Sequence, residues 1–241
     1  MYKSDIFECD FSRLTGKITL YLPGWATDYH VFYTRFLLEW DPKGDSPFLI
    51  KESPGLEGEE IALYMRYADP NDIPKLTAMI AKSTVTWHLV GFSLGGFIAH
   101  DLARHVPEKV ASLTLIGVRE QYPASVCRAM QRHLQQDKKQ LLEDFWKKAF
   151  GGIAQEMFLV EDYDTPMLSR GLAYLAQYSW QASPFPFPVT CLHGEADMIA
   201  PLSEAQTLAQ RKGWRLQILP GAGHGVWSVS ETLFERASPG P

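Results

Sequence analysis

Short apolar runs alternate along this chain with segments whose apolar residues recur at helical spacing. Strand-length runs, several of them nearly apolar throughout as in strands covered on both faces, span residues 17–22, 47–52, 85–90, 110–117, 188–194 and 214–220. Between them, residues 93–109 and 202–213 carry helical patterns, and the second ends in basic residues and a glycine, as helix C-termini do. Strand and helix in alternation predict an α/β fold, a mostly parallel sheet with helices on both faces.

The alternation stops between residues 121 and 180, where no clear strand pattern is found. Residues 126–150 and 166–180 have helical patterns instead, separated by a pair of glycines and an acidic loop. The prolines of residues 184–188 then prevent a helix from continuing. We therefore expect a core domain, residues 1–120 and 181–241, with a helical lid, residues 121–180, inserted between two strands of the sheet.

Composition and charge argue against several classes of protein. The net charge of −5 gives no general attraction to nucleic acid or to an anionic membrane. No run approaches the roughly 18 apolar residues of a membrane span, and the first residues are too charged for a secretory signal. We expect a cytoplasmic protein that binds neither nucleic acid nor membrane. The cysteines, Cys9, Cys127 and Cys191, lack the spacing of a metal site, so no metal is predicted.

The stretch LVGFSLGGF contains Gly91, Ser93 and Gly95 at the end of a predicted strand and the start of a predicted helix. In this context G-x-S-x-G is typical of a nucleophile elbow, a strained turn that lifts one serine out of the sheet. Small residues are needed on both sides because strand and helix approach closely. The N–H groups and positive dipole end of the helix favour an oxyanion beside the serine. The alternative is that Ser93 is only a helix N-cap.

A serine nucleophile needs a base and an acid that orients the base. His224, one of seven histidines, lies in a glycine-rich loop after a predicted strand, where it can reach outward. The acid should precede the histidine in the chain. Asp197 lies just past another predicted strand and is the first candidate, with Glu195 the second. His193 is interpreted as a structural residue that holds this turn.

Residues 88–117, 193–201 and 221–227 together resemble the α/β-hydrolase superfamily, and the resemblance extends from about residue 17 to 237. It implies the α/β-hydrolase fold with a helical lid, and a catalytic triad of Ser93, Asp197 and His224. It favours Asp197 over Glu195, because the family's acid lies in an H-G-x-x-D stretch. The mechanism it implies needs neither a metal nor an organic cofactor.

The stretch LPGWATD, residues 22–28, follows the first predicted strand. In the superfamily this loop usually reads His-Gly and then an apolar residue, whose N–H forms the oxyanion hole with that of the residue after the nucleophile. The resemblance implies that Trp25 and Leu94 have these roles here. Pro23 stands where the family most often has histidine, so the loop must be held in another way, since proline offers no donor. The alternative is that Trp25 only packs against the sheet edge.

Within the superfamily, the chain most resembles the pimeloyl-acyl-carrier-protein methyl ester esterases of biotin synthesis. The resemblance lies in the short chain, the Gly-Trp pair after the first strand, the FSLGG elbow and the compact helical lid. Those enzymes hydrolyse a methyl ester on an acyl chain that a small acidic protein carries. The resemblance implies the same activity here and assigns Phe145 to substrate contact.

The segment that begins the predicted lid is basic although the chain is acidic. Basic residues outnumber acidic ones by seven to four between residues 119 and 148. Arg128, Arg132 and Lys139 have the spacing that places them along one face of a single helix. Such a face would suit an acidic acyl carrier protein. The alternative is an ordinary solvated face.

Two other kinds of function stay open on the sequence alone. Thioesterases, and the lyases or C–C hydrolases of menaquinone and aromatic-ring metabolism, share the fold and the triad. Hydrolase-like receptors keep the fold, and some keep the triad, but they bind a ligand without catalysis. A panel of oxygen-ester and thioester substrates separates the enzymes, and turnover that is lost in His224→Ala excludes the receptor.

Overall fold

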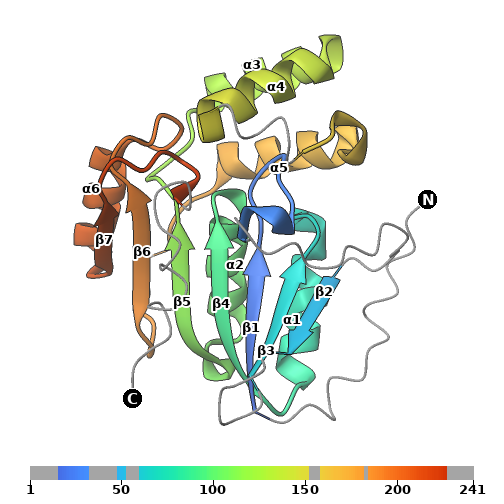
Figure 1. The fold of residues 1–241 in the computed structure, drawn as a ribbon. Helices are drawn as coiled ribbons and strands as arrows, with labels where there is room; N and C mark the ends of the chain where they lie inside the picture. The colour runs from blue at the N-terminus through green and yellow to red at the C-terminus, as the bar shows by residue number, and fades with distance from the viewer. Residues whose placement is uncertain (1–15, 33–47, 53–59, 152–157, 182–183, 227–241) are drawn as a thin grey trace.

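A seven-stranded sheet is the framework of the computed structural model, which describes residues 16–32, 48–52, 60–151, 158–181 and 184–226 (Figure 1). The strands are β1 (Lys17–Leu22), β2 (Phe48–Glu52), β3 (Glu60–Met65), β4 (Thr86–Phe92), β5 (Val110–Ile116), β6 (Val189–Gly194) and β7 (Arg215–Leu219). Their order is β2-β3-β1-β4-β5-β6-β7, and every neighbouring pair is parallel except β2 with β3. The mostly parallel α/β sheet expected from the sequence is confirmed.

Strand β3 is the one strand of the sheet that the sequence pattern does not predict. It pairs in parallel with β1, from Lys17 opposite Glu60 to Tyr21 opposite Tyr64, and antiparallel with β2. Its sequence, EIALYM, contains glutamate, alanine, leucine and methionine, which favour helix by intrinsic propensity. Pairing on both sides overrides that local preference.

Helices connect the parallel strands and cover the sheet. They are α1 (Ile73–Lys82), α2 (Leu94–His105) and α6 (Leu202–Lys212), with 3-10 helices η3 (Tyr29–Phe32), η4 (Pro70–Asp72) and η5 (Pro107–Lys109) in the connections. Helix α2 contacts β4, β5 and β1 at the centre of the sheet. The core there is mostly apolar and includes Ile18, Leu20, Leu89 and Phe97. No helix in the described ranges is long and apolar enough to cross a membrane.

A group of helices that we call the helical insert lies between β5 and β6 along the chain. It consists of α3 (Ala124–Gln136), α4 (Lys138–Phe150), η7 (Val160–Asp162) and α5 (Thr165–Gln177). In Figure 1 these helices lie above the carboxyl ends of the central strands. The described part of the insert contains no strand. The division into a core of residues 1–120 and 181–241 and a lid of residues 121–180 stays a prediction.

Residues 126–150 form two helices, so the prediction of a single helix is wrong. The chain leaves the helical conformation at Asp137, where φ is −150° and ψ is 84°. The Asp137 carboxylate accepts a hydrogen bond of 3.0 Å from the Gln140 N–H and caps the second helix. An aspartate followed three residues later by glutamine is a known helix-start signal. The break was therefore readable in the sequence.

Candidate active site

Ser93 lies in a strained turn between β4 and α2. Its φ of 50° and ψ of −118° are a conformation that residues with a Cβ atom rarely adopt. The Ser93 N–H donates a hydrogen bond of 2.8 Å to the Ile116 carbonyl, which ties the turn to the end of β5. The turn therefore has the backbone strain that a nucleophile elbow requires.

Gly91 and Gly95 allow the strand and the helix of this turn to approach within backbone contact. A Cβ atom on Gly91 would lie 2.3 Å from the carbonyl oxygen of Gly95. A Cβ atom on Gly95 would lie 2.1 Å from the carbonyl oxygen of Leu22 at the end of β1. Both distances are far shorter than real Cβ contacts. Only glycine fits at these positions, because strand and helix approach closely, as expected from the sequence.

Asp197 and His224 meet beyond the carboxyl ends of β6 and β7. The Asp197 Oδ2 atom lies 2.7 Å from His224 Nδ1, and both side chains are fully buried. The other carboxylate oxygen, Oδ1, accepts hydrogen bonds of 2.8 Å from the N–H groups of Ile199 and Ala200. Burial opposes ionisation of Asp197, but the attraction of His224 and these hydrogen bonds more than offset it, so the pKa of Asp197 is lowered.

The second candidate acid, Glu195, is turned away from His224. Its Oε2 atom accepts a hydrogen bond of 3.1 Å from the Gly221 N–H, and its side chain is exposed. His193 lies beside Asp197, with its Nε2 atom 2.7 Å from the Ala200 carbonyl oxygen and 3.6 Å from Asp197 Oδ2. This contact agrees with the structural role expected of His193. The fold thus brings Asp197, and not Glu195, to the histidine.

The imidazole of His224 lies against the turn that carries Ser93. Its ring centroid is 4.9 Å from that of Phe92, the residue before the serine. On another side, a Cβ atom on Gly117 would lie 3.1 Å from the imidazole. The Nε2 atom of His224 is buried and has no hydrogen-bond partner in the described part of the chain. The nitrogen opposite Asp197 is therefore available to accept a proton.

Tyr122 is a site residue that the sequence analysis does not single out. Its hydroxyl lies close enough to the Ser93 side chain for the two groups to interact. Burial raises the pKa of Tyr122 well above its usual value, although the contact with Ser93 opposes the shift, and the phenol stays neutral. The guanidinium of Arg119 lies 5.1 Å from the ring centroid. Its position in the sequence could have identified Tyr122 as a site residue. It follows β5, at the edge where the parallel strands end and where ligands bind in such folds.

Trp25 and Leu94 flank the serine from two different elements. The loop after β1 lies against the elbow, since a Cβ atom on Gly24 would be 3.1 Å from the Ser93 Cβ. Leu94 is the first residue of α2, and the first N–H groups of a helix have no partner within it. Both side chains are buried. The structure therefore brings these two sequence-predicted residues to the serine.

Phe145 reaches the same loop from α4. Its ring meets the Trp25 ring edge to face, with centroids 4.9 Å apart and an interplanar angle of 87°. The side chain is half-buried. Contact between Phe145 and a substrate stays a prediction.

The three basic residues proposed for partner binding do not lie on one helix, so the prediction of a single helix face is wrong. Arg128 and Arg132 are exposed on α3, where with neighbouring polar side chains they line a depression of about 430 Å³. Lys139 lies on α4, beyond the break at Asp137, and its ammonium is 3.9 Å from Glu143. Only the two arginines share a helix face.

The described residues include no group of three or more His, Cys, Asp and Glu side chains able to hold a metal ion. Cys127 and Cys191 are buried and unpaired, and burial raises the pKa of Cys191 to about 12. Cys9 lies outside the described residues.

A strained serine at a strand-to-helix turn, at the same edge of a parallel sheet as a buried acid and histidine pair, is the arrangement of an α/β hydrolase. The chain belongs to the alpha/beta hydrolase family, whose model matches residues 20–236.

One curated relative is a pimeloyl-[acyl-carrier protein] methyl ester esterase of Aromatoleum aromaticum. It is 30% identical over 148 residues, which cover 50% of this chain and 59% of the relative. The chain therefore matches less than two thirds of that protein's length.

Solved structures with the same fold come from several bacteria. An esterase from Thermogutta terrifontis has a TM-score of 0.64 and 16% identity, over 92% of this chain and 90% of that one. A hydrolase from Pseudomonas aeruginosa has a TM-score of 0.68 and 18% identity, over 91% and 87%. A 2-hydroxy-6-oxo-6-phenylhexa-2,4-dienoate hydrolase from a Rhodococcus strain has a TM-score of 0.59 and 16% identity, over 91% and 88%. At such identities these likenesses show the fold alone.

Proposed function

We propose that this protein is a serine esterase that hydrolyses an acyl-chain ester through an acyl-enzyme intermediate. The observation that carries the proposal is the fully buried contact of 2.7 Å between Asp197 and His224, at the sheet edge where Ser93 sits in its strained turn. A pair of buried titratable groups beside a candidate nucleophile is the arrangement that activates a serine.

In this mechanism His224 acts through the ring nitrogen that faces away from Asp197. Its Nε2 atom takes the Ser93 hydroxyl proton as the oxygen attacks the ester carbonyl, and gives that proton to the departing alcohol. Asp197 holds the other ring proton at Nδ1 and stabilises the imidazolium that forms. Because the pKa of Asp197 is lowered, its carboxylate is ionised at neutral pH. Water activated by His224 then attacks the acyl-enzyme and releases the acid.

The negative charge that develops on the carbonyl oxygen requires donors beside Ser93. We assign this role to the N–H groups of Trp25 and Leu94, which flank the serine. Loss of one such donor typically costs about 10²- to 10³-fold in rate.

The substrate that we propose is the methyl ester of a pimeloyl chain on an acyl carrier protein. The curated relative, of which the match covers 59%, supports this choice. In this proposal the helical insert acts as a lid, Phe145 contacts the acyl chain, and the exposed Arg128 and Arg132 bind the acidic carrier. A cytoplasmic location stays a prediction from the sequence.

The test measures release of the free acid by mass spectrometry. Wild-type protein and Ser93→Ala are each given the pimeloyl methyl ester on its carrier protein. We expect acid from the wild type only. If the wild type cleaves thioesters or carbon–carbon bonds but no oxygen ester, the esterase proposal is overturned in favour of the other enzyme classes. Ligand binding without any turnover would favour a receptor.

Carrier binding has a separate test. Replacing both Arg128 and Arg132 by alanine should raise KM for the carrier-linked ester and leave KM for the free methyl ester unchanged. The control is Lys82→Ala, which removes an exposed positive charge from α1, outside the helical insert. Equal effects of the double variant on both substrates would contradict carrier docking at α3.

A further inference from the structure

The loop after β1 is hydrogen bonded to two helices of the helical insert. We call residues 23–28 the β1 loop. The indole N–H of Trp25 donates to the Leu168 carbonyl of α5 at 2.8 Å. In the other direction, the indole N–H of Trp146 on α4 donates to the Ala26 carbonyl at 2.6 Å. Trp25 and Trp146 are 3% and 2% exposed, so these bonds form away from water. The loop cannot leave either helix without exposing or orphaning a buried polar group.

A third hydrogen bond closes the β1 loop on itself. The Gly24 N–H donates to the Thr27 Oγ1 atom at 2.7 Å, and Thr27 is 1% exposed. This bond fixes the backbone directly before the Trp25 N–H. Pro23 cannot contribute here because its nitrogen carries no hydrogen. The Thr27 hydroxyl therefore supplies a side-chain contact that steadies the turn.

Backbone strain shows that the β1 loop depends on these contacts. Ala26 has a φ of 52°, and with Ser93 it is one of two non-glycine residues with positive φ in the described part of the chain. Such a conformation is strained and persists only where the surroundings enforce it. The hydrogen bond from Trp146 to the Ala26 carbonyl is a contact of that kind.

Helix α5 also packs directly on both residues assigned to the oxyanion hole. A Cβ atom on Gly171 would lie 2.9 Å from Leu94 Cδ2 and 2.9 Å from Trp25 Cδ1. A larger residue at this position would require these side chains to shift. The helical insert therefore lies in direct contact with both residues assigned to the oxyanion hole.

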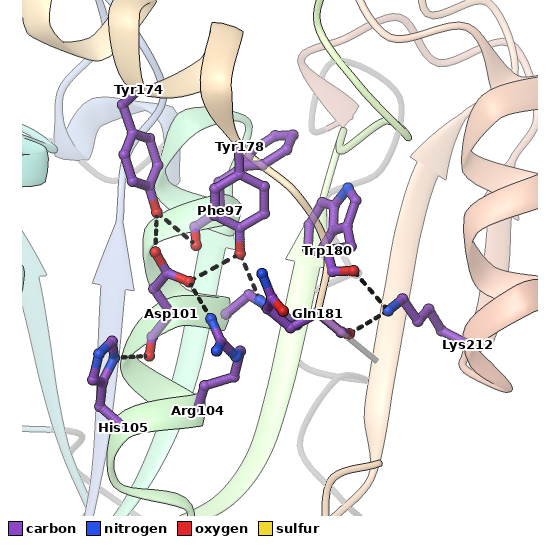
Figure 2. A network of polar contacts seen from close by, with 10 residues as sticks. Phe97, Asp101, Arg104, His105, Tyr174, Tyr178, Trp180, Gln181 and Lys212 are labelled. Carbon is purple, nitrogen blue, oxygen red and sulfur yellow. Dashed lines mark hydrogen bonds and ion pairs between the residues drawn. The ribbon is translucent and has the colours of Figure 1, made fainter. Parts of the chain in front are cut away.

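A polar network further along the same helix anchors α5 to α2, the helix that starts at Leu94. Figure 2 shows Tyr174 of α5 and Tyr178, the residue directly after α5, pointing toward Asp101 on α2. The Tyr174 hydroxyl donates to Asp101 Oδ2 at 2.7 Å, and the Tyr178 hydroxyl lies 3.3 Å from Oδ1. The helical insert is therefore attached both to the β1 loop and to the helix of the elbow.

We propose that the helical insert is a fixed part of the oxyanion hole, in which Trp146 and Thr27 are positioning residues that aim the Trp25 N–H at the reacting carbonyl oxygen. The inference rests on the proposed function. Oxyanion donors act only when they lie within about 2.7–3.1 Å of the charged oxygen. A small shift of the β1 loop therefore weakens the transition state more than the ground state and lowers kcat rather than raising KM.

The test uses a small fluorophosphonate, whose phosphoryl oxygen occupies the oxyanion position when the serine is labelled. Thr27→Val removes the hydroxyl at nearly constant shape, Thr27→Ser keeps it, and Trp146→Phe removes the indole N–H. We expect Thr27→Val and Trp146→Phe each to lower the maximal inactivation rate by about 10-fold or more. The dissociation constant of the fluorophosphonate before it reacts should change little. Thr27→Ser should retain nearly the wild-type inactivation rate.

The matched control is Trp87→Phe. Trp87 also donates its indole N–H, to Ser83 Oγ at 2.7 Å, and is fully buried. It lies near the start of β4, about 20 Å along the strand from Ser93. This variant should lose stability and keep the wild-type inactivation rate. If thermal melting shows that Trp146→Phe does not fold, the comparison of Thr27→Val with Thr27→Ser is the test.

Three results would overturn the inference while the esterase proposal stands. The first is a maximal inactivation rate that stays at the wild-type value in both Thr27→Val and Trp146→Phe. The second is a rate that falls equally in Thr27→Val and Thr27→Ser. The third is a rate that falls as much in Trp87→Phe as in Trp146→Phe. In each case Ser93→Ala stays unlabelled. Failure of the wild-type protein to react with the fluorophosphonate would instead reject the serine esterase itself, and the inference with it.

Discussion

The carboxylate of Asp197 lies 2.7 Å from the imidazole of His224, inside the protein and out of contact with water. Glu195 is only two residues away in the chain, yet it bonds the Gly221 N–H at the surface. The loop after β6 therefore separates two neighbouring acids into different environments, one able to orient the histidine and one not.

Substitution of the two acids should separate their roles. Asp197→Asn should lower kcat by about 10³- to 10⁴-fold, because the amide no longer holds the imidazole in the required tautomer. Glu195→Gln should leave kcat within about twofold of the wild type, since it keeps an acceptor for the turn and does not reach His224. Steady-state kinetics on any ester that the wild type turns over is the measurement. A larger loss in Glu195→Gln than in Asp197→Asn would reverse the assignment.

The close approach at Gly95 predicts a large loss of stability on adding one methyl group. In Gly95→Ala the new Cβ atom would lie 2.1 Å from the carbonyl oxygen of Leu22, so β1 and α2 must separate. We expect the free energy of unfolding in urea to fall by about 3 kcal/mol or more. Gly223→Ala is the control, because its nearest contact would be an ordinary 3.7 Å. Similar melting curves for both variants would contradict the close approach.

The hydrogen bond from Tyr174 to Asp101 predicts a difference between two tyrosine-to-phenylalanine variants. Tyr174→Phe removes a donor 2.7 Å from the carboxylate and should lower the free energy of unfolding by about 1.5–3 kcal/mol. Tyr163→Phe should be neutral or stabilising, because that hydroxyl is buried with no hydrogen-bond partner in the described ranges. Urea unfolding measures both. No loss in Tyr174→Phe would show that the network in Figure 2 contributes nothing to stability, and a greater loss in Tyr163→Phe would contradict the predicted difference.

His100 predicts a dependence of stability on pH. Burial, with the nearby charges of Arg104 and Lys212, lowers the pKa of His100 from 6.5 to about 3. Between these values the unfolded chain binds a proton at this residue and the folded chain does not. The contribution of His100 to the free energy of unfolding is therefore fully present above pH 6.5. It is lost as the pH falls, by up to about 1.4 kcal/mol per pH unit. In His100→Phe the free energy of unfolding should fall less steeply over this range, and an unchanged slope would contradict the prediction.

Much of the site could be read from local sequence because its requirements are local. A strained turn between a strand and a helix needs glycine on both sides, so Gly91 and Gly95 point to Ser93 within five residues. His224 and Asp197 each follow a strand in a short loop. Parallel strands end at one edge of a sheet, so residues that follow them gather there. Even the break at Asp137, which the prediction of one long helix overlooks, carries a local capping signal.

Other features depend on partners that are far apart in the chain. Strand β3 forms only because β1 and β2 pair with it, against the local preference of its residues. Tyr122 meets Ser93 only once β4 and β5 are side by side. The position of Tyr122 after a strand indicates only the sheet edge at which it lies, and the pairing of the strands decides which residue it meets.

The sequence alone determined the order of strands and helices in outline, the strained serine and the residues that could serve as its base and acid. The tertiary structure decided which acid meets His224 and how a β1 loop containing Pro23 is held. Trp146 and Ala26 are 120 residues apart, and Trp25 and Leu168 are 143 apart. A hydrogen bond between groups so distant in sequence exists only after packing has buried both, because in the unfolded chain water satisfies each of them equally well.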